Sequence, residues 1–208
     1  MAEIKNIVFD LGQVLLPIDF NAPVHAFKNL GLSDFDNLYH QSLQADLFDS
    51  LETGRISEAE FREEMRRLSG EDWTDEQIDQ AWSTIILDFR PETMDMLVQL
   101  RKRYPLFLLS NTNSIHYSVY DAQVRRRFNK KGLSAYFDKA YYSHEMGLRK
   151  PDPEIFRRMA ADAGIKPADS LFIDDNADNI RVAGELGFNV LHHQPEKKVE
   201  KEIKSVLR

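Results

Sequence analysis

The chain has 208 residues, 42% of them hydrophobic, which is enough to bury a core in one large domain or in one domain that carries an insert. The formal net charge of −7 argues against a nucleic-acid-binding surface, and the absence of cysteine excludes disulfides, thiolate catalysis and cysteine-ligated zinc. No apolar stretch reaches the about 18 residues of a membrane span, and Asp10 interrupts the early apolar run. We therefore expect a cytoplasmic protein with no signal peptide and no membrane partner.

The chain begins with a predicted buried strand and continues as a helical block. The strand covers Ile4 to Phe9, because this run is short, β-branched and aromatic. The pattern is helical from about Ile18 to Arg90, and capping boxes at 57–60 and 74–77 predict the starts of two helices. Two further helices are expected before them, one from about Pro23 to Gly31 and one from near Ser33.

The second half of the chain alternates helices with short apolar strands. A helix is predicted from Pro91 to Arg103, one after the cap residue Asp152 with Gly164 past its end, one from about Ala177 to Gly187, and a charged helix at the C-terminus. Four further strands are predicted, at 106–109, 140–142, 171–173 and 188–191.

Strands that are apolar on both faces and alternate with helices indicate a parallel sheet covered on both sides. The early helical block is too long for a simple crossover between two strands. We therefore predict an α/β fold, with a Rossmann-like core formed by residues 1–17 and 90–208 and a helical cap inserted as residues 18–89.

Polar side chains follow the predicted strands at their carboxyl ends, where open α/β sheets bind ligands. Converging carboxylates repel one another unless a cation compensates them, and oxygen ligands without cysteine or a histidine pair point to Mg²⁺. The ammonium, hydroxyl and backbone N–H groups then suit a tetrahedral anion such as phosphate. A carboxylate that touches both metal and phosphate can attack phosphorus. The residues concerned are Asp10, Ser110, Asn111, Lys150, Asp174 and Asp175.

Four segments together resemble the haloacid dehalogenase-like hydrolases. They are "VFDLGQV" with Asp10, the serine Ser110, "GLRKPDPEIF" with Lys150, and "LFIDDNADN" with Asp174 and Asp175. The resemblance covers the whole chain in order. Within the family, "FDLGQVLLPIDFN", "LLSNTNSIH", "MGLRKP" and "FIDDNADNI" are most similar to bacterial phosphatases that act on α-glucose 1-phosphate.

The resemblance implies a Rossmann-like core with a C1-type cap and a Mg²⁺-dependent phosphatase. The substrate would be a small phosphorylated metabolite, with sugar phosphates first, and the intermediate an aspartyl-phosphate. We expect the protein to be a monomer or a small homo-oligomer.

The resemblance also assigns roles to residues of the site. Asp10 is the nucleophile and a metal ligand, and the Gly12 carbonyl and Asp175 complete the metal set. Asp174 is either a further ligand or a support behind the site, and the resemblance leaves both open. Lys150 neutralises the phosphate and orients Asp10. Four residues are expected to bind the phosphate beside Lys150: Leu11, Gly12, Ser110 and Asn111.

Gly12 departs from the family's pattern. Most phosphatases of the family have a second Asp at this position, which protonates the leaving group and then activates water, and such groups contribute about 10²–10⁴-fold. Three interpretations stay open. In the first, the leaving group departs unaided, as the anomeric oxygen of a sugar allows. In the second, His116 or the cap residue Glu52 takes the place of the missing acid and base. In the third, turnover is slow and the chain is a phosphate-binding regulator.

An enzymatic alternative is a metal-independent 2-haloacid dehalogenase, which shares the aspartate nucleophile. The acidic pair Asp174-Asp175 argues against it. The cap loop near Gly54 is a candidate for substrate contact through Phe48, Glu52 and Arg55, because similar caps send such a loop toward the active site. Phe61 and Trp82 are interpreted as cap core.

Overall fold

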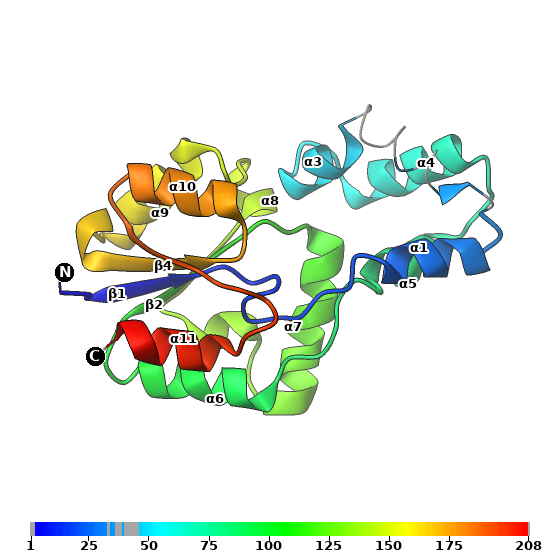
Figure 1. Cartoon of the computed structure of the whole chain (residues 1–208). Helices are drawn as coiled ribbons and strands as arrows, with labels where there is room; N and C mark the ends of the chain where they lie inside the picture. The colour runs from blue at the N-terminus through cyan, green and yellow to red at the C-terminus, as the bar shows by residue number, and fades with distance from the viewer. Residues whose placement is uncertain (1–2, 33, 36–38, 40–45, 208) are drawn as a thin grey trace.

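The computed structural model describes residues 3–32, 34, 35, 39 and 46–207. Within these residues, five parallel strands form one sheet in the order β3-β2-β1-β4-β5 (Figure 1). Every predicted strand is present, and no strand end differs from the prediction by more than two residues. The strands are β1 (Asn6–Phe9), β2 (Leu106–Ser110), β3 (Lys139–Tyr142), β4 (Ser170–Asp174) and β5 (Asn189–His192).

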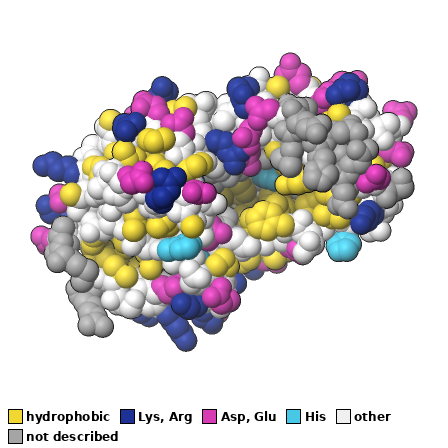
Figure 2. Space-filling model, turned by 45° about the horizontal axis from the view of Figure 1, so that its top comes forward, with side chains coloured by type: hydrophobic (Ala, Val, Ile, Leu, Met, Phe, Trp, Pro, Cys, Tyr) yellow, Lys and Arg dark blue, Asp and Glu magenta, His cyan; other side chains and the backbone are white. Residues whose placement is uncertain are grey.

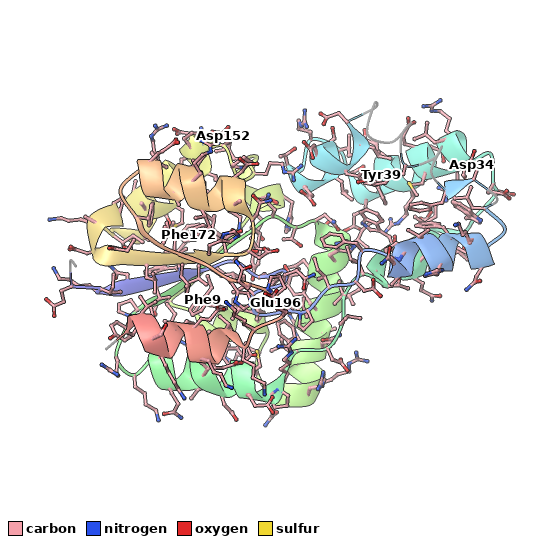
Figure 3. All side chains as sticks on the ribbon, viewed as in Figure 1. Phe9, Asp34, Tyr39, Asp152, Phe172 and Glu196 are labelled. Atoms are coloured by element: carbon pink, nitrogen blue, oxygen red, sulfur yellow. The ribbon has the colours of Figure 1, made fainter. Side chains whose placement is uncertain are left out.

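Helices cover both faces of this sheet, which confirms the predicted α/β architecture. One face carries α6 (Pro91–Leu100), α7 (Ser114–Phe128) and α11 (Val199–Val206), and the other carries α9 (Pro153–Ala163) and α10 (Ala177–Glu185). Phe9 and Phe172 belong to neighbouring strands and lie in the clusters on opposite faces (Figure 3). All residues of β2 and β4 are buried, as strands with two covered faces require.

The helix starts follow the capping signals of the sequence. Ser57 caps the start of α4 (Glu58–Ser69) through a reciprocal pair of hydrogen bonds. Its backbone N–H donates to the Glu60 carboxylate at 2.7 Å, and the Glu60 N–H donates to the Ser57 hydroxyl at 3.2 Å. The same reciprocal pair between Thr74 and Gln77 begins α5 (Asp75–Ser83). Asp152 caps α9, and Gly164 ends it in the left-handed conformation. The helix predicted from near Ser33 lies outside the described residues.

Between β1 and α6 the chain forms a separate group of helices, here called the cap helices: α1 (Ala22–Asn29), α3 (Leu47–Glu52), α4 and α5. They lie to one side of the sheet (Figure 1) and pack around a separate hydrophobic cluster, to which the core helix α7 contributes Ile115. Phe61 is fully buried in this cluster and Trp82 packs against it, as predicted.

Two segments connect the cap helices to the sheet, and they run side by side. The Asp19 N–H donates to the Ile85 carbonyl at 2.9 Å, and the Leu87 N–H donates to the Pro17 carbonyl at 3.1 Å. Ile18 and Ile86 thereby form an antiparallel bridge. The cap helices are thus joined to the core through one short paired connection.

The remaining described elements are short: α8 (Ser143–Met146) after β3, and 3₁₀ turns at Leu133–Tyr136 and Pro167–Asp169. Among the helices that the structure describes, none has the length and apolar character needed to cross a bilayer.

Candidate active site

Lys150 bridges two carboxylates at the carboxyl end of the sheet. Asp10 follows β1, and Asp174 ends the neighbouring strand β4. The Lys150 ammonium donates to Asp10 Oδ1 at 2.6 Å and to Asp174 Oδ2 at 2.7 Å. Burial alone lowers the pKa of Lys150, but the charges of Asp10 and Asp174 outweigh burial and hold that pKa above its ordinary value. The lysine is 2% exposed and stays charged between its two partners.

The Asp174 carboxylate is fully buried and saturated with hydrogen bonds. Its Oδ1 accepts from the Asn176 N–H at 2.8 Å and from Asn179 Nδ2 at 3.1 Å. Its Oδ2 accepts from Lys150 and from Asn179 Nδ2, the latter at 3.0 Å. A carboxylate has about four acceptor positions, and these four contacts use them. Asp174 therefore acts as an internal anchor for Lys150.

Asp175 is half-buried beside this anchor. Carboxylate oxygens of Asp10, Asp174 and Asp175 lie within 4.8 Å of one another. Burial raises the pKa of Asp10 to about 7; Lys150 opposes this effect and Asp174 adds to it. Burial and the charge of Asp174 also raise the pKa of Asp175. Three carboxylates share the single ammonium of Lys150, so the ionised cluster carries net negative charge and fits a hard divalent cation.

The chain turns tightly after Asp10. The Gly12 carbonyl accepts from the Val14 N–H at 2.7 Å, which leaves its second lone pair for another partner. The Leu11 carbonyl accepts from the N–H groups of Leu15 and Leu16. A Cβ placed on Gly12 would meet only Ile18 Cδ1, at 3.5 Å, which is an ordinary contact. Space around the backbone therefore does not require glycine at this position.

Asn111, which follows Ser110 at the end of β2, holds the loop that carries Lys150. Its Nδ2 donates to the Lys150 carbonyl and its Oδ1 accepts from the Lys150 N–H, both at 2.9 Å. Ser110 is 1% exposed at the strand end. The sequence pattern predicts Asn111 only as a phosphate-binding position, because no local signal indicates a side-chain contact across 39 residues.

His116 is held between α7 and the cap helices. Its Nε2 faces the Trp82 carbonyl at 3.2 Å and its Nδ1 faces Asn113 Nδ2 at 3.2 Å, while the ring stacks on Trp82. Burial lowers the pKa of His116 to about 4, so the ring is neutral at pH 7. Because both ring nitrogens already have partners, His116 connects the cap to the core and is poorly placed to act as a general acid.

The three cap candidates have different surroundings. Phe48 stacks on Trp82 with ring centroids 4.9 Å apart. Arg55 is exposed and pairs with Asp46. Glu52 faces the core, where its Oε2 lies 3.3 Å from an Arg149 nitrogen. The surface is hollowed between the cap and the sheet, with hydrophobic side chains on its floor (Figure 2).

Known proteins resemble the chain over nearly its whole length. A curated D-ribitol-5-phosphate phosphatase of Bacteroides thetaiotaomicron is 40% identical over 195 residues, which cover 93% of this chain and 92% of that protein. A HAD family enzyme of the same species, solved in complex with magnesium and inorganic phosphate, superposes with a TM-score of 0.85 at 37% identity and covers 94% of this chain and 96% of its own. A predicted HAD-like hydrolase of Porphyromonas gingivalis superposes with a TM-score of 0.88 at 38% identity, covering 100% and 99%.

More distant structures share the fold alone. The L-2-haloacid dehalogenase of Xanthobacter autotrophicus superposes with a TM-score of 0.58 at 20% identity and covers 90% of this chain and 76% of its own. A family model described as haloacid dehalogenase-like hydrolase matches residues 4–187, which include every strand of the sheet except β5. The chain therefore belongs to the haloacid dehalogenase-like hydrolases.

Proposed function

We propose that the chain is a Mg²⁺-dependent phosphatase that acts on small phosphorylated metabolites, with phosphorylated sugars and sugar alcohols as the substrate class. The observation that carries the proposal is the buried Lys150, whose ammonium is 2.6 Å from Asp10 and 2.7 Å from Asp174 at the edge of the sheet where Ser110 also ends its strand. The likeness to a phosphatase of a sugar alcohol phosphate supports the substrate class.

In this proposal Mg²⁺ is held by Asp10, the Gly12 carbonyl and Asp175. Asp174 stays behind the site, because its acceptor positions are used by Lys150, Asn176 and Asn179. The bound ion supplies positive charge that compensates the carboxylates and polarises the phosphate. The magnesium and phosphate complex of the similar Bacteroides enzyme supports this choice of metal.

The protein groups perform two displacements at phosphorus. Lys150 fixes the Asp10 carboxylate, which attacks phosphorus and forms an aspartyl-phosphate as the substrate's P–O bond breaks. Water then attacks phosphorus and releases the Asp10 carboxylate and inorganic phosphate. The Ser110 hydroxyl, the Lys150 ammonium and the backbone N–H groups of Leu11, Gly12 and Asn111 bind the phosphoryl oxygens.

Residues 1–17 and 90–208 form the catalytic core in this proposal, and residues 18–89 form the cap that selects the substrate. Two substrates test the selection. D-ribitol 5-phosphate releases a primary alcohol and requires a proton for its leaving group, whereas α-glucose 1-phosphate releases a more acidic anomeric hydroxyl. Hydrolysis of the second substrate alone would place the chain with the α-glucose 1-phosphate phosphatases.

The test is steady-state release of inorganic phosphate from a panel of phosphorylated sugars and sugar alcohols, with Mg²⁺ and with EDTA. The matched control is Asp10→Asn, which keeps the shape of the side chain but removes the nucleophile. The proposal expects turnover that requires Mg²⁺ and that Asp10→Asn abolishes. Release of halide from 2-haloacids without Mg²⁺ would make the chain a dehalogenase, and phosphate binding without turnover would make it a regulator.

A further inference from the structure

We propose that Glu52, on the cap helix α3, is the general acid and base that Gly12 does not supply. This inference rests on the proposed phosphatase function and names a catalytic residue for it. Because Glu52 comes from the cap and Asp10 from the core, the proton transfers that accompany the two displacements would proceed only while the cap is docked on the site.

The turn that carries Glu52 lies directly against the core. Glu52 ends α3, and Gly54 follows with a left-handed φ of 64°. A Cβ on Gly54 would lie 2.4 Å from the carbonyl oxygen of His144, which belongs to the core helix α8. The backbone of the cap turn thus touches the segment that leads from β3 to Lys150.

Arg149 fixes the side of α3 that faces the site. Its guanidinium pairs with Asp49 and, at 3.3 Å, with Glu52 Oε2. The next residue is Lys150, whose ammonium contacts Asp10. The Glu52 carboxylate therefore lies beside the loop that carries Lys150, near enough for the charges of Lys150 and Asp10 to act on it.

The Glu52 carboxylate has an open hydrogen-bonding position. About a quarter of the side chain, 26%, is exposed, but its Oε2 atom is buried, and no donor in the described part of the chain forms a hydrogen bond to that atom. The Arg149 guanidinium, 3.3 Å away, balances the charge of this oxygen without forming a hydrogen bond to it. The O–H group of a substrate or a water would donate the hydrogen bond that the atom lacks. This is the position from which a proton can pass to or from the reacting oxygen.

The proton affinity of Glu52 suits both displacements. Burial raises its pKa to about 7; the charge of Lys150 opposes this effect and that of Asp10 adds to it. A carboxyl group with a pKa near the working pH can give a proton and take one back. His116, the other candidate, has a pKa of about 4 and both ring nitrogens engaged.

The proton balance of the reaction follows. In the first displacement the electron pair of the breaking P–O bond goes to the leaving oxygen, which takes the proton of the Glu52 carboxyl group. In the second, the Glu52 carboxylate takes a proton from water as the water oxygen bonds to phosphorus, and the pair of the Asp10–phosphorus bond returns to Asp10. The sum is a phosphomonoester and water giving an alcohol and inorganic phosphate, with Glu52 protonated again.

The test compares Glu52→Gln with the wild type on two substrates in Mg²⁺. On D-ribitol 5-phosphate, which needs a protonated leaving group, kcat is expected to fall about 10²–10⁴-fold. On p-nitrophenyl phosphate, whose leaving group needs no proton, the first displacement stays fast and the second stalls. Stopped-flow should then show a burst of nitrophenolate equal to the enzyme concentration, followed by slow turnover.

The matched control is Asp49→Asn, which removes the other carboxylate that pairs with Arg149 from the same helix. We expect it to change both substrates by the same small factor and to give no burst. The proposal is overturned if Glu52→Gln keeps wild-type kcat on D-ribitol 5-phosphate, if it slows both substrates equally without a burst, or if Asp49→Asn reproduces its behaviour. Absence of turnover in the wild type itself would instead overturn the proposed function and this inference with it.

Discussion

Asn111 and Lys150 are 39 residues apart in the chain, yet the Asn111 side chain makes two hydrogen bonds of 2.9 Å to the Lys150 backbone. This pair sets the position from which the lysine ammonium reaches Asp10 and Asp174. The loops after β2 and β3 are thereby joined to each other, and the position of the lysine depends on both.

Replacing Asn111 with Ala should reduce both stability and turnover. Two hydrogen bonds of about 1 kcal/mol each are lost, and a displaced lysine can cost up to about 10²-fold in kcat. Urea unfolding and phosphate-release kinetics measure the two effects. Asn189→Ala is the control. The Asn189 side-chain amide also donates to a backbone carbonyl, that of Ala168, but Asn189 lies at the start of β5 and does not hold the Lys150 loop. Wild-type kcat in the Asn111 variant would contradict the positioning role.

Replacing Lys150 with Met should destabilise the metal-free protein by about 3–5 kcal/mol, because two buried carboxylates lose their shared cation. Mg²⁺ should restore part of this loss, since the ion compensates Asp10. Denaturant unfolding with EDTA and with Mg²⁺ measures both. Lys139→Met is the control: its exposed pair with Asp162 is worth less than about 1 kcal/mol. Equal losses of unfolding free energy in the two variants would contradict the role of Lys150 as a buried bridge between Asp10 and Asp174.

The metal-free protein should lose stability as pH rises through about 7. The folded-state pKa of both Asp10 and Glu52 is about 7, against ordinary values of 3.8 and 4.5, so the folded state binds protons that the unfolded state releases. His116 and His144 act in the opposite direction, but only up to about their ordinary pKa of 6.5. The loss levels off above the folded-state pKa of about 7, so thermal unfolding in EDTA is measured at pH 6.5, 7 and 8.

The double variant Asp10→Asn, Glu52→Gln is the control for this pH dependence and should lose most of it. In the proposed site Mg²⁺ binds the ionised form of Asp10, so the stabilising effect of Mg²⁺ should be larger at pH 8 than at pH 6. Stability in EDTA that increases between pH 7 and 8 would show that these carboxyl groups are ionised in the folded protein.

Gly12→Asp should fold with a stability within about 1 kcal/mol of the wild type, because a Cβ there makes only an ordinary contact with Ile18. In the Glu52→Gln background it should raise kcat on D-ribitol 5-phosphate by restoring a carboxyl group. Gly54→Ala is the contrasting variant, since its Cβ would clash with the His144 carbonyl at a left-handed φ. It should raise KM and lower the melting temperature. The expectation fails if the two glycines respond alike.

The strands and the capped helices could be predicted from the sequence because their signals are local. Apolar runs mark β1, β2 and β4, and Ser57 and Thr74 mark helix starts through contacts within a few residues. The rule that parallel strands end at one edge then places Asp10 and Asp174 together.

The remaining features depend on how distant loops pack against one another. No local pattern or periodicity predicts three of these contacts. They are the hydrogen bonds of Asn111 to Lys150, the ion pair of Arg149 with Glu52, and the hydrogen bonds of Asn179 to Asp174. The sequence therefore leaves the role of Asp174 open, and its hydrogen bonds in the folded chain favour a support behind the site.

The central claim is that Asp10, held by Lys150, carries the phosphoryl group during turnover. The direct measurement is mass spectrometry of peptides after rapid acid quench of enzyme mixed with Mg²⁺ and D-ribitol 5-phosphate or p-nitrophenyl phosphate. The account predicts one phosphoryl group on the peptide that contains Asp10, formed within the first turnover and absent in Asp10→Asn. Full turnover by the Asp10→Asn variant, or wild-type turnover with the phosphoryl group on another residue, would contradict it.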